Sequence, residues 1–277
     1  MSERMSGDAL RARSAELRKL IVRAICRTPG GHLGAALSIA DLLTVLYTDI
    51  LAVDPARPDD PSRDRFVLSK GHAAVALYAA LYQAGFISRE ILDSFGSRGT
   101  VLGGHPDMHK VPGVEASTGA LGHGLSFGVG TALSGRLENR GFRVFVLLGD
   151  GECQEGSVWE ALLFAPAHAL DNLTVIVDYN KLQAMDRLES IVPLEPLADK
   201  LRAFGWEVRE IDGHDVDEIR ETLSRVPLAP GRPSAIVAHT VKGKGISFME
   251  NVPIWHYRLP DEEERRIICR ELEMEGL

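Results

Sequence analysis

The sequence predicts an α/β fold with three layers, in which helices cover both faces of a mainly parallel central sheet. Short apolar runs rich in branched side chains alternate with longer segments of helical periodicity, which is typical of a parallel sheet. Two of these runs, residues 143–148 and 173–177, are almost continuously apolar, as strands buried on both faces are. The 277 residues are 45% apolar and contain no linker-like stretch, so we expect a single domain over residues 1–277.

The elements before the first strand are predicted to be helices. Residues 8–27 place apolar side chains at helical spacing between charged ones, and the Thr-Pro-Gly-Gly stretch at 28–31 cannot continue a helix. Ser38 is expected to cap a second helix that ends near Leu51. The elements expected after it are, in order, a strand at 66–69, an Ala-rich helix ending near residue 85, a helix at 121–138, a strand at 143–148, a helix at 157–170, a strand at 173–177, a helix at 197–204, a strand at 206–211, a helix at 215–225, a strand at 235–240 and a charged helix at 261–275.

Two stretches interrupt this alternation. Residues 94–119 are rich in Gly, Pro and His and have little periodicity. A long irregular segment inside a compact domain is usually functional or disordered. Pro166 lies within the helix expected at 157–170 and should kink that helix or end it early.

Charge and cysteine content narrow the class of protein. The net charge is −8, from 31 basic and 39 acidic residues, and no basic face stands out, so nucleic acid is not an expected partner. The three cysteines form no Cys-x-x-Cys pair, which fits a reducing compartment. The charged amino terminus and the lack of any apolar run of about 18 residues argue against secretion and against a membrane-spanning segment. We therefore expect a cytoplasmic protein with no membrane partner.

A metal and diphosphate site is predicted where two strands end. Asp150 stands between Gly149 and Gly151 directly after one apolar run, and Asn180 follows the next run. Because the carboxyl ends of parallel strands meet at one edge of a sheet, these two side chains can converge. A carboxylate and an amide oxygen suit a hard divalent cation such as Mg²⁺ or Ca²⁺. The two glycines let a diphosphate approach the backbone, and the helix that follows points its amino end at the anion.

Two simpler interpretations of the glycine motifs were weighed. A Gly-Asp-Gly turn often only starts a helix, but Asn180 at the end of the following strand favours a site over a bare turn. A dinucleotide-binding fingerprint would need the order Gly-x-Gly-x-x-Gly. The stretch Gly119-x-x-Gly122-x-Gly124 reverses that order, so a nucleotide-binding Rossmann domain is not expected.

Histidines next to glycine recur before the metal motif. His32, His72, His105 and His123 share this context, and it predicts a common site although a single histidine would usually be structural. His105 and His109 have the i, i+4 spacing of a helical zinc pair. The glycines and the proline around them disfavour a helix, so zinc is not expected.

Six short motifs follow one another in a fixed order: Gly31-His32-Leu33-Gly34, Lys70-Gly71-His72, Gly104-His105-Pro106-Asp107, Ser117-Thr118-Gly119-Ala120-Leu121-Gly122, Gly149-Asp150-Gly151 and Asn180. In this order they resemble transketolase, over nearly the whole chain. The closest resemblance is to the amino-terminal, separately encoded subunit of split transketolases. It implies a thiamine-diphosphate-binding fold, with a central parallel sheet between two helical layers and the diphosphate held through a divalent metal.

The resemblance also implies a role for individual residues. The metal ligands would be Asp150, Asn180 and the backbone carbonyl of Leu182. The remaining cofactor contacts would come from Gly119, Leu121, His123, Gly149, Gly151, Glu152 and Asn180. The catalytic residues would be His32, His72, His105 and His256, together with Glu155, which would link two active sites across a dimer. Histidines tuned near neutral pH are suited to proton transfer with sugar hydroxyls.

The sequence departs from the family pattern at three places. His123 stands where full-length transketolases commonly carry glutamine. Asn180 follows Tyr179 rather than a second Asn or an Asp. His256 is followed by Tyr257 and Arg258, where split relatives usually have Gly and Lys.

The resemblance implies that this chain supplies half of an active site. In the family, a glutamate that acts on the cofactor and arginines that hold the sugar phosphate come from later domains. We therefore expect a second subunit that carries the pyrimidine-binding domain, in an α₂β₂ assembly. The expected activity is the transfer of a two-carbon ketol unit from a ketose phosphate to an aldose phosphate.

Two other functions stay open. The chain could belong to another thiamine diphosphate enzyme, resembling deoxyxylulose-phosphate synthase or a dehydrogenase E1 component, although the stretches at 69–72 and 117–119 look more like transketolase. A non-catalytic thiamine-diphosphate-binding module is the other possibility, which His123 keeps open. Retention of Glu155 and of the other histidines argues against it.

Overall fold

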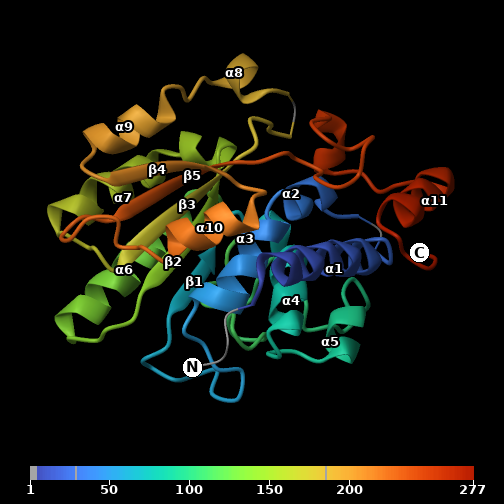
Figure 1. Ribbon diagram of the computed structural model, residues 1–277, viewed down its shortest axis with the longest axis horizontal. Helices are drawn as coiled ribbons and strands as arrows, with labels where there is room; N and C mark the ends of the chain where they lie inside the picture. The colour runs from blue at the N-terminus through green and yellow to red at the C-terminus, as the bar shows by residue number, and fades with distance from the viewer. Residues whose placement is uncertain (1–4, 29, 185) are drawn as a thin grey trace.

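A five-stranded parallel sheet forms the centre of the computed structural model, which describes residues 5–28, 30–184 and 186–277 (Figure 1). The strands lie in the order β1-β2-β3-β5-β4, and every neighbouring pair is parallel. Each of the expected apolar runs forms one strand, so the predicted sheet is confirmed. The strands are β1 (Arg65–Leu68), β2 (Val144–Gly149), β3 (Leu173–Tyr179), β4 (Glu207–Asp212) and β5 (Ser234–His239).

Helices from the first half of the chain cover one face of the sheet. Alternate side chains of a strand point to opposite faces, so Phe145, Leu147 and Ile176 all face this layer and join one buried cluster with it. Helix α10 from the second half of the chain completes the layer (Figure 1). Its helices are α1 (Gly7–Ile25), α2 (Leu33–Leu37), α3 (Ala40–Val45), α4 (Ala74–Gln83) and α10 (Val216–Leu223).

The opposite face of the sheet carries a second helical layer. Val146, Val175 and Val177 alternate with the residues of the first cluster and form a second buried cluster with this layer. Gly128 lets helix α6 lie close to the sheet, since a Cβ there would come within 2.4 Å of a methyl group of Val146. The predicted three-layer architecture is therefore confirmed. The helices of this layer are α6 (His123–Leu137), α7 (Gly156–Ala167) and α9 (Leu197–Ala203).

Short elements connect the layers, and most of them lie near strand ends. Residues 94–119 form neither helix nor strand, as expected, and Pro166 lies one residue before the end of α7. Among the described residues, no helix combines the length and the apolar character needed to cross a membrane. The short elements are η1 (Leu46–Ile50), η2 (Gly71–Ala73), α5 (Arg89–Asp93), η3 (Gly151–Gln154), α8 (Leu188–Ile191) and η4 (Pro253–His256), and α11 (Glu262–Glu271) follows them.

The helix start predicted at Ser38 is wrong. Helix α2 ends at Leu37 and helix α3 begins at Ala40, so Ser38 lies at a break between two short helices. Its hydroxyl does not cap a helix but donates to the carboxylate of Asp178, with 2.7 Å between Oγ and Oδ2. Asp178 is fully buried at the end of β3, and its need for hydrogen-bond donors outweighs the local capping preference.

Candidate active site

A cavity of about 410 Å³ opens at the carboxyl ends of β2 and β3. Most of the residues that the sequence marks as functional line it. The exceptions are His123 and Glu155. The lining residues are His32, Ala35, Lys70, His72, His105, Gly119, Leu121, Gly149, Asp150, Gly151, Glu152, Asn180, Leu182, Gln183, Ala184, Lys242 and His256.

Asp150 lies at the floor of the cavity because β2 ends at Gly149 and the chain turns there. Its carboxylate is 2% exposed and accepts the backbone N–H groups of Gly151, at 2.7 Å, and of Lys181. Burial and the nearby charge of Asp178 raise the pKa of Asp150 to about 7. A carboxylate that is this costly to ionise gains from a cation beside it.

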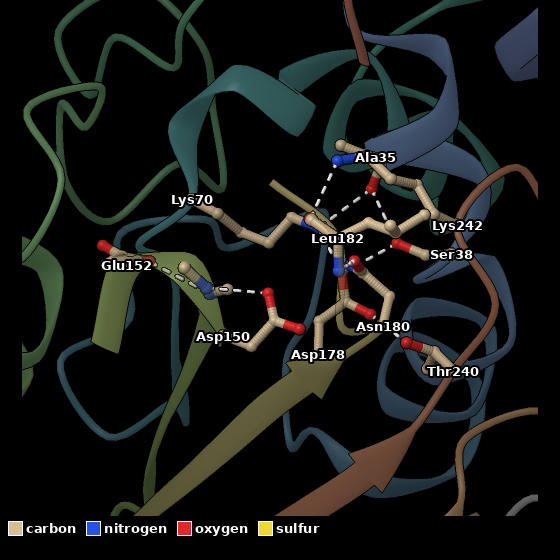
Figure 2. Close-up of polar contacts among 12 residues, drawn as sticks. Ala35, Ser38, Lys70, Asp150, Glu152, Asp178, Asn180, Leu182, Thr240 and Lys242 are labelled. Carbon is tan, nitrogen blue, oxygen red and sulfur yellow. Dashed lines mark hydrogen bonds and ion pairs between the residues drawn. The ribbon is translucent and has the colours of Figure 1, made fainter. Parts of the chain in front are cut away.

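Asp178 organises the ends of three strands (Figure 2). Its carboxylate accepts hydrogen bonds from Ser38, Thr240 and the ammonium of Lys70, and from Nδ2 of Asn180 at 3.0 Å. Burial opposes its ionisation, but the Lys70 charge and these donors lower the pKa of Asp178 below its ordinary value. The carboxylate is therefore ionised at neutral pH, and it holds Asn180 and Lys70 in place.

The three expected metal ligands lie within one short stretch of space (Figure 2). The register of the sheet pairs Gly149 with Asp178, which brings the residues just beyond them, Asp150 and Asn180, to the same edge. Oδ1 of Asn180 accepts the N–H of Leu182 at 3.1 Å, which fixes the amide orientation. A carboxylate, an amide oxygen and a backbone carbonyl are the hard oxygen donors that Mg²⁺ and Ca²⁺ prefer, so this set fits such an ion. Groups of three or more His, Cys, Asp or Glu side chains able to hold a metal do not occur in the described part of the chain.

Two buried lysines in the cavity were missed by the sequence reasoning. Lys70 is 1% exposed and pairs with Asp178, while its ammonium also donates to the carbonyl of Ala35 at 3.0 Å. Lys242 is 2% exposed, and its ammonium donates to the Leu182 carbonyl at 3.0 Å. Burial lowers the pKa of Lys242 to about 8. Both residues stand in motifs with glycine, which could have pointed to them, but lysine burial cannot be read from local sequence.

Three of the expected histidines form one cluster at the wall of the cavity. The ring centroids of His32, His72 and His256 lie 5.0, 5.1 and 5.4 Å apart. Burial, with smaller contributions from the lysines and neighbouring imidazoles, lowers the pKa of His32 to about 4 and that of His256 to about 3. The same causes hold the pKa of His72 well below its ordinary value. All three rings are therefore neutral at pH 7 and can both donate and accept a hydrogen bond.

His105 reaches the same cavity from the irregular segment. A Cβ at Gly119 would come within 2.7 Å of the His105 ring, and Gly119 has a φ of +142°, so only glycine fits there. The close approach of Gly119 thus sets the position of the His105 ring.

Glu152 lies at the cavity wall but directs its carboxylate into the protein. Its oxygens accept the N–H of Gly122 at 2.9 Å, the N–H of Gly149 at 3.1 Å and the hydroxyl of Ser69 at 2.5 Å. These contacts tie the loop before α6 to the turn after β2. The structure thus gives Glu152 a bracing role, and its direct contact with a cofactor stays a prediction.

His123 and Glu155 lie outside the cavity, on the outer side of α6 and α7. Both are exposed; Nδ1 of His123 contacts the carbonyl of Leu121 at 3.0 Å. Glu155 makes no side-chain hydrogen bond or ion pair with any residue that the structure describes. Exposed apolar side chains lie on the same two helices or beside them: Leu121 (37% exposed), Phe127 (42%), Leu163 (63%) and Phe164 (41%).

Comparison with known proteins assigns this arrangement to a family. Residues 11–266 match the model of the transketolase thiamine diphosphate binding domain. The chain belongs to the transketolase family. A subunit of the apulose-4-phosphate transketolase of Phocaeicola vulgatus is 42% identical over 268 residues, which cover 97% of this chain and 95% of that protein. The 6-deoxy-6-sulfo-D-fructose transketolase subunit SqwG of Clostridium sp. (strain MSTE9) is 44% identical over 260 residues, 94% of each chain.

Solved transketolases share the fold but are longer. The transketolase of Leishmania mexicana matches with a TM-score of 0.90 at 29% identity, over 98% of this chain and 42% of that chain. The transketolase of Campylobacter jejuni matches with a TM-score of 0.89 at 30% identity, over 98% of this chain and 43% of that one. The present chain thus spans less than half of these transketolases. The prediction of the thiamine-diphosphate-binding portion of a transketolase-type transferase is confirmed, in preference to a deoxyxylulose-phosphate synthase or dehydrogenase E1 component.

Proposed function

We propose that this transketolase chain binds thiamine diphosphate through Mg²⁺ or Ca²⁺ and, with a second subunit, transfers a two-carbon ketol unit between sugar phosphates. The observation that carries the proposal is the meeting of Asp150, Asn180 and the Leu182 carbonyl with two buried lysines in one cavity. Buried cations facing hard oxygen ligands suit an anion held through a metal.

The two lysines would stabilise the diphosphate end of the cofactor. Lys70 is held by Asp178, so its charge is already partly compensated. Lys242 has no carboxylate partner in the described part of the chain and donates only to neutral acceptors, namely two backbone carbonyls and the imidazole of His256. Its charge is therefore available to an anion. We propose Lys242 as the main cationic contact and Lys70 as a supporting one.

The histidines would handle protons around the substrate. When bound, thiamine diphosphate supplies the carbon nucleophile that takes up the two-carbon unit. Nδ1 of His256 accepts from Lys242 at 2.9 Å, which leaves its proton on Nε2 as a donor. The neutral rings of His32, His72 and His105 can hold sugar hydroxyls and accept or return a proton at a ring nitrogen.

The outer side of α6 and α7 is proposed to contact the partner. The two relatives described above are each named as one subunit of a transketolase, so they belong to enzymes of more than one chain. Leu163 and Phe127 leave apolar surface in solvent beside Glu155, which carries no partner among the described residues. Burial of this surface against a second copy of this chain and the pyrimidine-binding subunit would give an α₂β₂ enzyme, with Glu155 linking two sites.

Substrates and compartment follow from chemistry rather than from direct observation. Two relatives act, by their names, on apulose-4-phosphate and on 6-deoxy-6-sulfo-D-fructose, so an anionic sugar is the substrate class that we propose. The free and mostly buried cysteines, Cys26, Cys153 and Cys269, support a reducing cytoplasm.

Native mass spectrometry tests the proposal. The chain would be purified from its own cells in Mg²⁺ and thiamine diphosphate. We expect a second protein of comparable size to co-purify and the assembly to carry two cofactor molecules per four chains. A lone chain that carries no thiamine diphosphate would support a non-catalytic module instead.

A further inference from the structure

The side-chain amide of Gln183 is an unused hydrogen-bond donor at the cavity. Its Nε2 is buried and has no hydrogen-bond partner among the residues that the structure describes. Gln183 itself lines the cavity. Buried amide groups almost always have a partner, so an orphaned donor at a ligand site calls for a physical explanation.

The backbone holds this side chain in a defined place. The N–H of Gln183 donates to the carbonyl of Asp186 at 2.9 Å, and its own carbonyl accepts from Lys242 at 3.3 Å. Leu182, one residue earlier, pairs with Arg187 in an isolated antiparallel bridge. Gln183 is therefore fixed by contacts on both sides.

The amide lies beside the turn that follows Asp150. A Cβ at Gly151 would come within 2.9 Å of Cγ of Gln183 and within 3.3 Å of Nε2. Gly151 begins η3, next to the metal ligand that we propose, and Lys242 lies on the other side of Gln183. The orphaned donor thus stands between a helical turn and a buried ammonium, where an anionic oxygen would be bound.

We propose that Gln183 is a cofactor-binding residue whose Nε2–H donates to an oxygen of the diphosphate. This rests on the proposed function and deepens it, because none of the sequence motifs or family positions includes Gln183. The amide would be unsatisfied without the cofactor and satisfied with it. Gln183 therefore opposes the stability of the free protein and favours the bound form.

Calorimetric titration of the Gln183→Met variant tests this. Methionine keeps the length of the side chain and removes the amide. In the assembly as purified, we expect the affinity for thiamine diphosphate with Mg²⁺ to fall about tenfold, because a hydrogen bond to a charged group contributes about that factor. The melting temperature without cofactor should stay the same or rise, since an orphaned polar group is removed.

Inorganic pyrophosphate with Mg²⁺ identifies the part of the cofactor that the amide contacts. The same fall in affinity should appear with pyrophosphate and be absent with thiamine alone. Gln83→Met is the matched control, because its amide donates to the carbonyl of Arg13 at 3.1 Å and lies outside the cavity. That variant should lower the melting temperature and leave cofactor affinity unchanged.

Three results would overturn the inference. Equal affinity of the wild-type protein and Gln183→Met for thiamine diphosphate would show that the amide makes no contact. A loss that appears with thiamine but not with pyrophosphate would place the amide at the ring end of the cofactor. A lower melting temperature, with equal losses for all ligands, would show a structural role. Failure of the wild-type protein to bind thiamine diphosphate would instead reject the proposed function.

Discussion

Lys242 donates a hydrogen bond to the backbone carbonyl of Leu182, with 3.0 Å between Nζ and the oxygen (Figure 2). This carbonyl is the third metal ligand in the proposed site. A carbonyl that already faces a positive charge is oriented to accept a cation. The ammonium also contacts His256, so one lysine joins the proposed metal and diphosphate end of the cavity to the histidine cluster.

Replacing Lys242 with Ala should weaken cofactor binding. The variant loses the proposed cationic contact with the diphosphate, and charge-assisted hydrogen bonds of this kind contribute about 1.5–3 kcal/mol. We expect affinity for thiamine diphosphate with Mg²⁺ to fall by about 10- to 100-fold in a calorimetric titration. Lys244→Ala is the control, because that side chain is 37% exposed and pairs only loosely with Glu250. Equal affinities in both variants would remove Lys242 from the site.

Replacing His72 with Ala should spare binding and reduce turnover. The ring belongs to the histidine cluster, whose members contact one another at the cavity wall. Loss of a proton-transferring group typically lowers the rate by about 10²-fold or more. The check is kcat measured beside cofactor affinity, with His239→Ala, an exposed residue paired to Glu210, as the control. A wild-type rate would mean that His72 is structural.

The histidine cluster should make the free protein sensitive to acid. The pKa of His32 is lowered to about 4 and that of His256 to about 3 in the folded protein, whereas both are near 6.5 in the unfolded chain. The unfolded chain therefore binds more protons as the pH falls below about 6.5. The free energy of unfolding should be greatest above pH 7 and decrease as the pH falls from about 6.5 towards 4.

Urea unfolding at several pH values measures this dependence. The variant His72→Gln should show a shallower loss of stability, since the pKa of His72 is also lowered in the folded state. His239→Gln changes an exposed ring and should leave the slope unchanged. If removal of His72 does not alter the slope, the buried histidines are not the source of the acid sensitivity.

Introducing charge on α7 should disturb assembly. Leu163 is 63% exposed on the helix that begins at Gly156, next to Glu155. In the Leu163→Glu variant a carboxylate would have to be buried at the proposed interface, which is unfavourable. We expect the mass measured by light scattering to shift towards the free subunits while the circular dichroism spectrum stays unchanged. An intact assembly would place the partner on another face.

The sheet was predictable because each strand is a local apolar run. Strand β3, for example, is buried at every position, so its sequence alone indicates its state. The break at Ser38 was not predictable, because it depends on Asp178, 140 residues away in the sequence. Local capping preference favoured a helix start there, and a long-range hydrogen bond replaced it.

The site was predictable to the extent that its residues stand in motifs. Asp150 and Asn180 follow strands, and parallel register brings them together. Lys70 and Lys242 were missed because a lysine is normally exposed, and only the partners supplied by distant segments make its burial possible. Gln183 was missed for a related reason, since an orphaned amide is visible only once its surroundings are known.

The most direct test of the account is calorimetric binding of thiamine diphosphate to the wild-type protein and to Asp150→Asn, each with and without Mg²⁺. Asparagine keeps the shape of the side chain, and burial already disfavours the charge of Asp150, so the variant should fold normally. We predict binding by the wild-type protein only with Mg²⁺ and no measurable binding by the variant. Wild-type affinity in Asp150→Asn would contradict the metal-held diphosphate on which the proposed function rests.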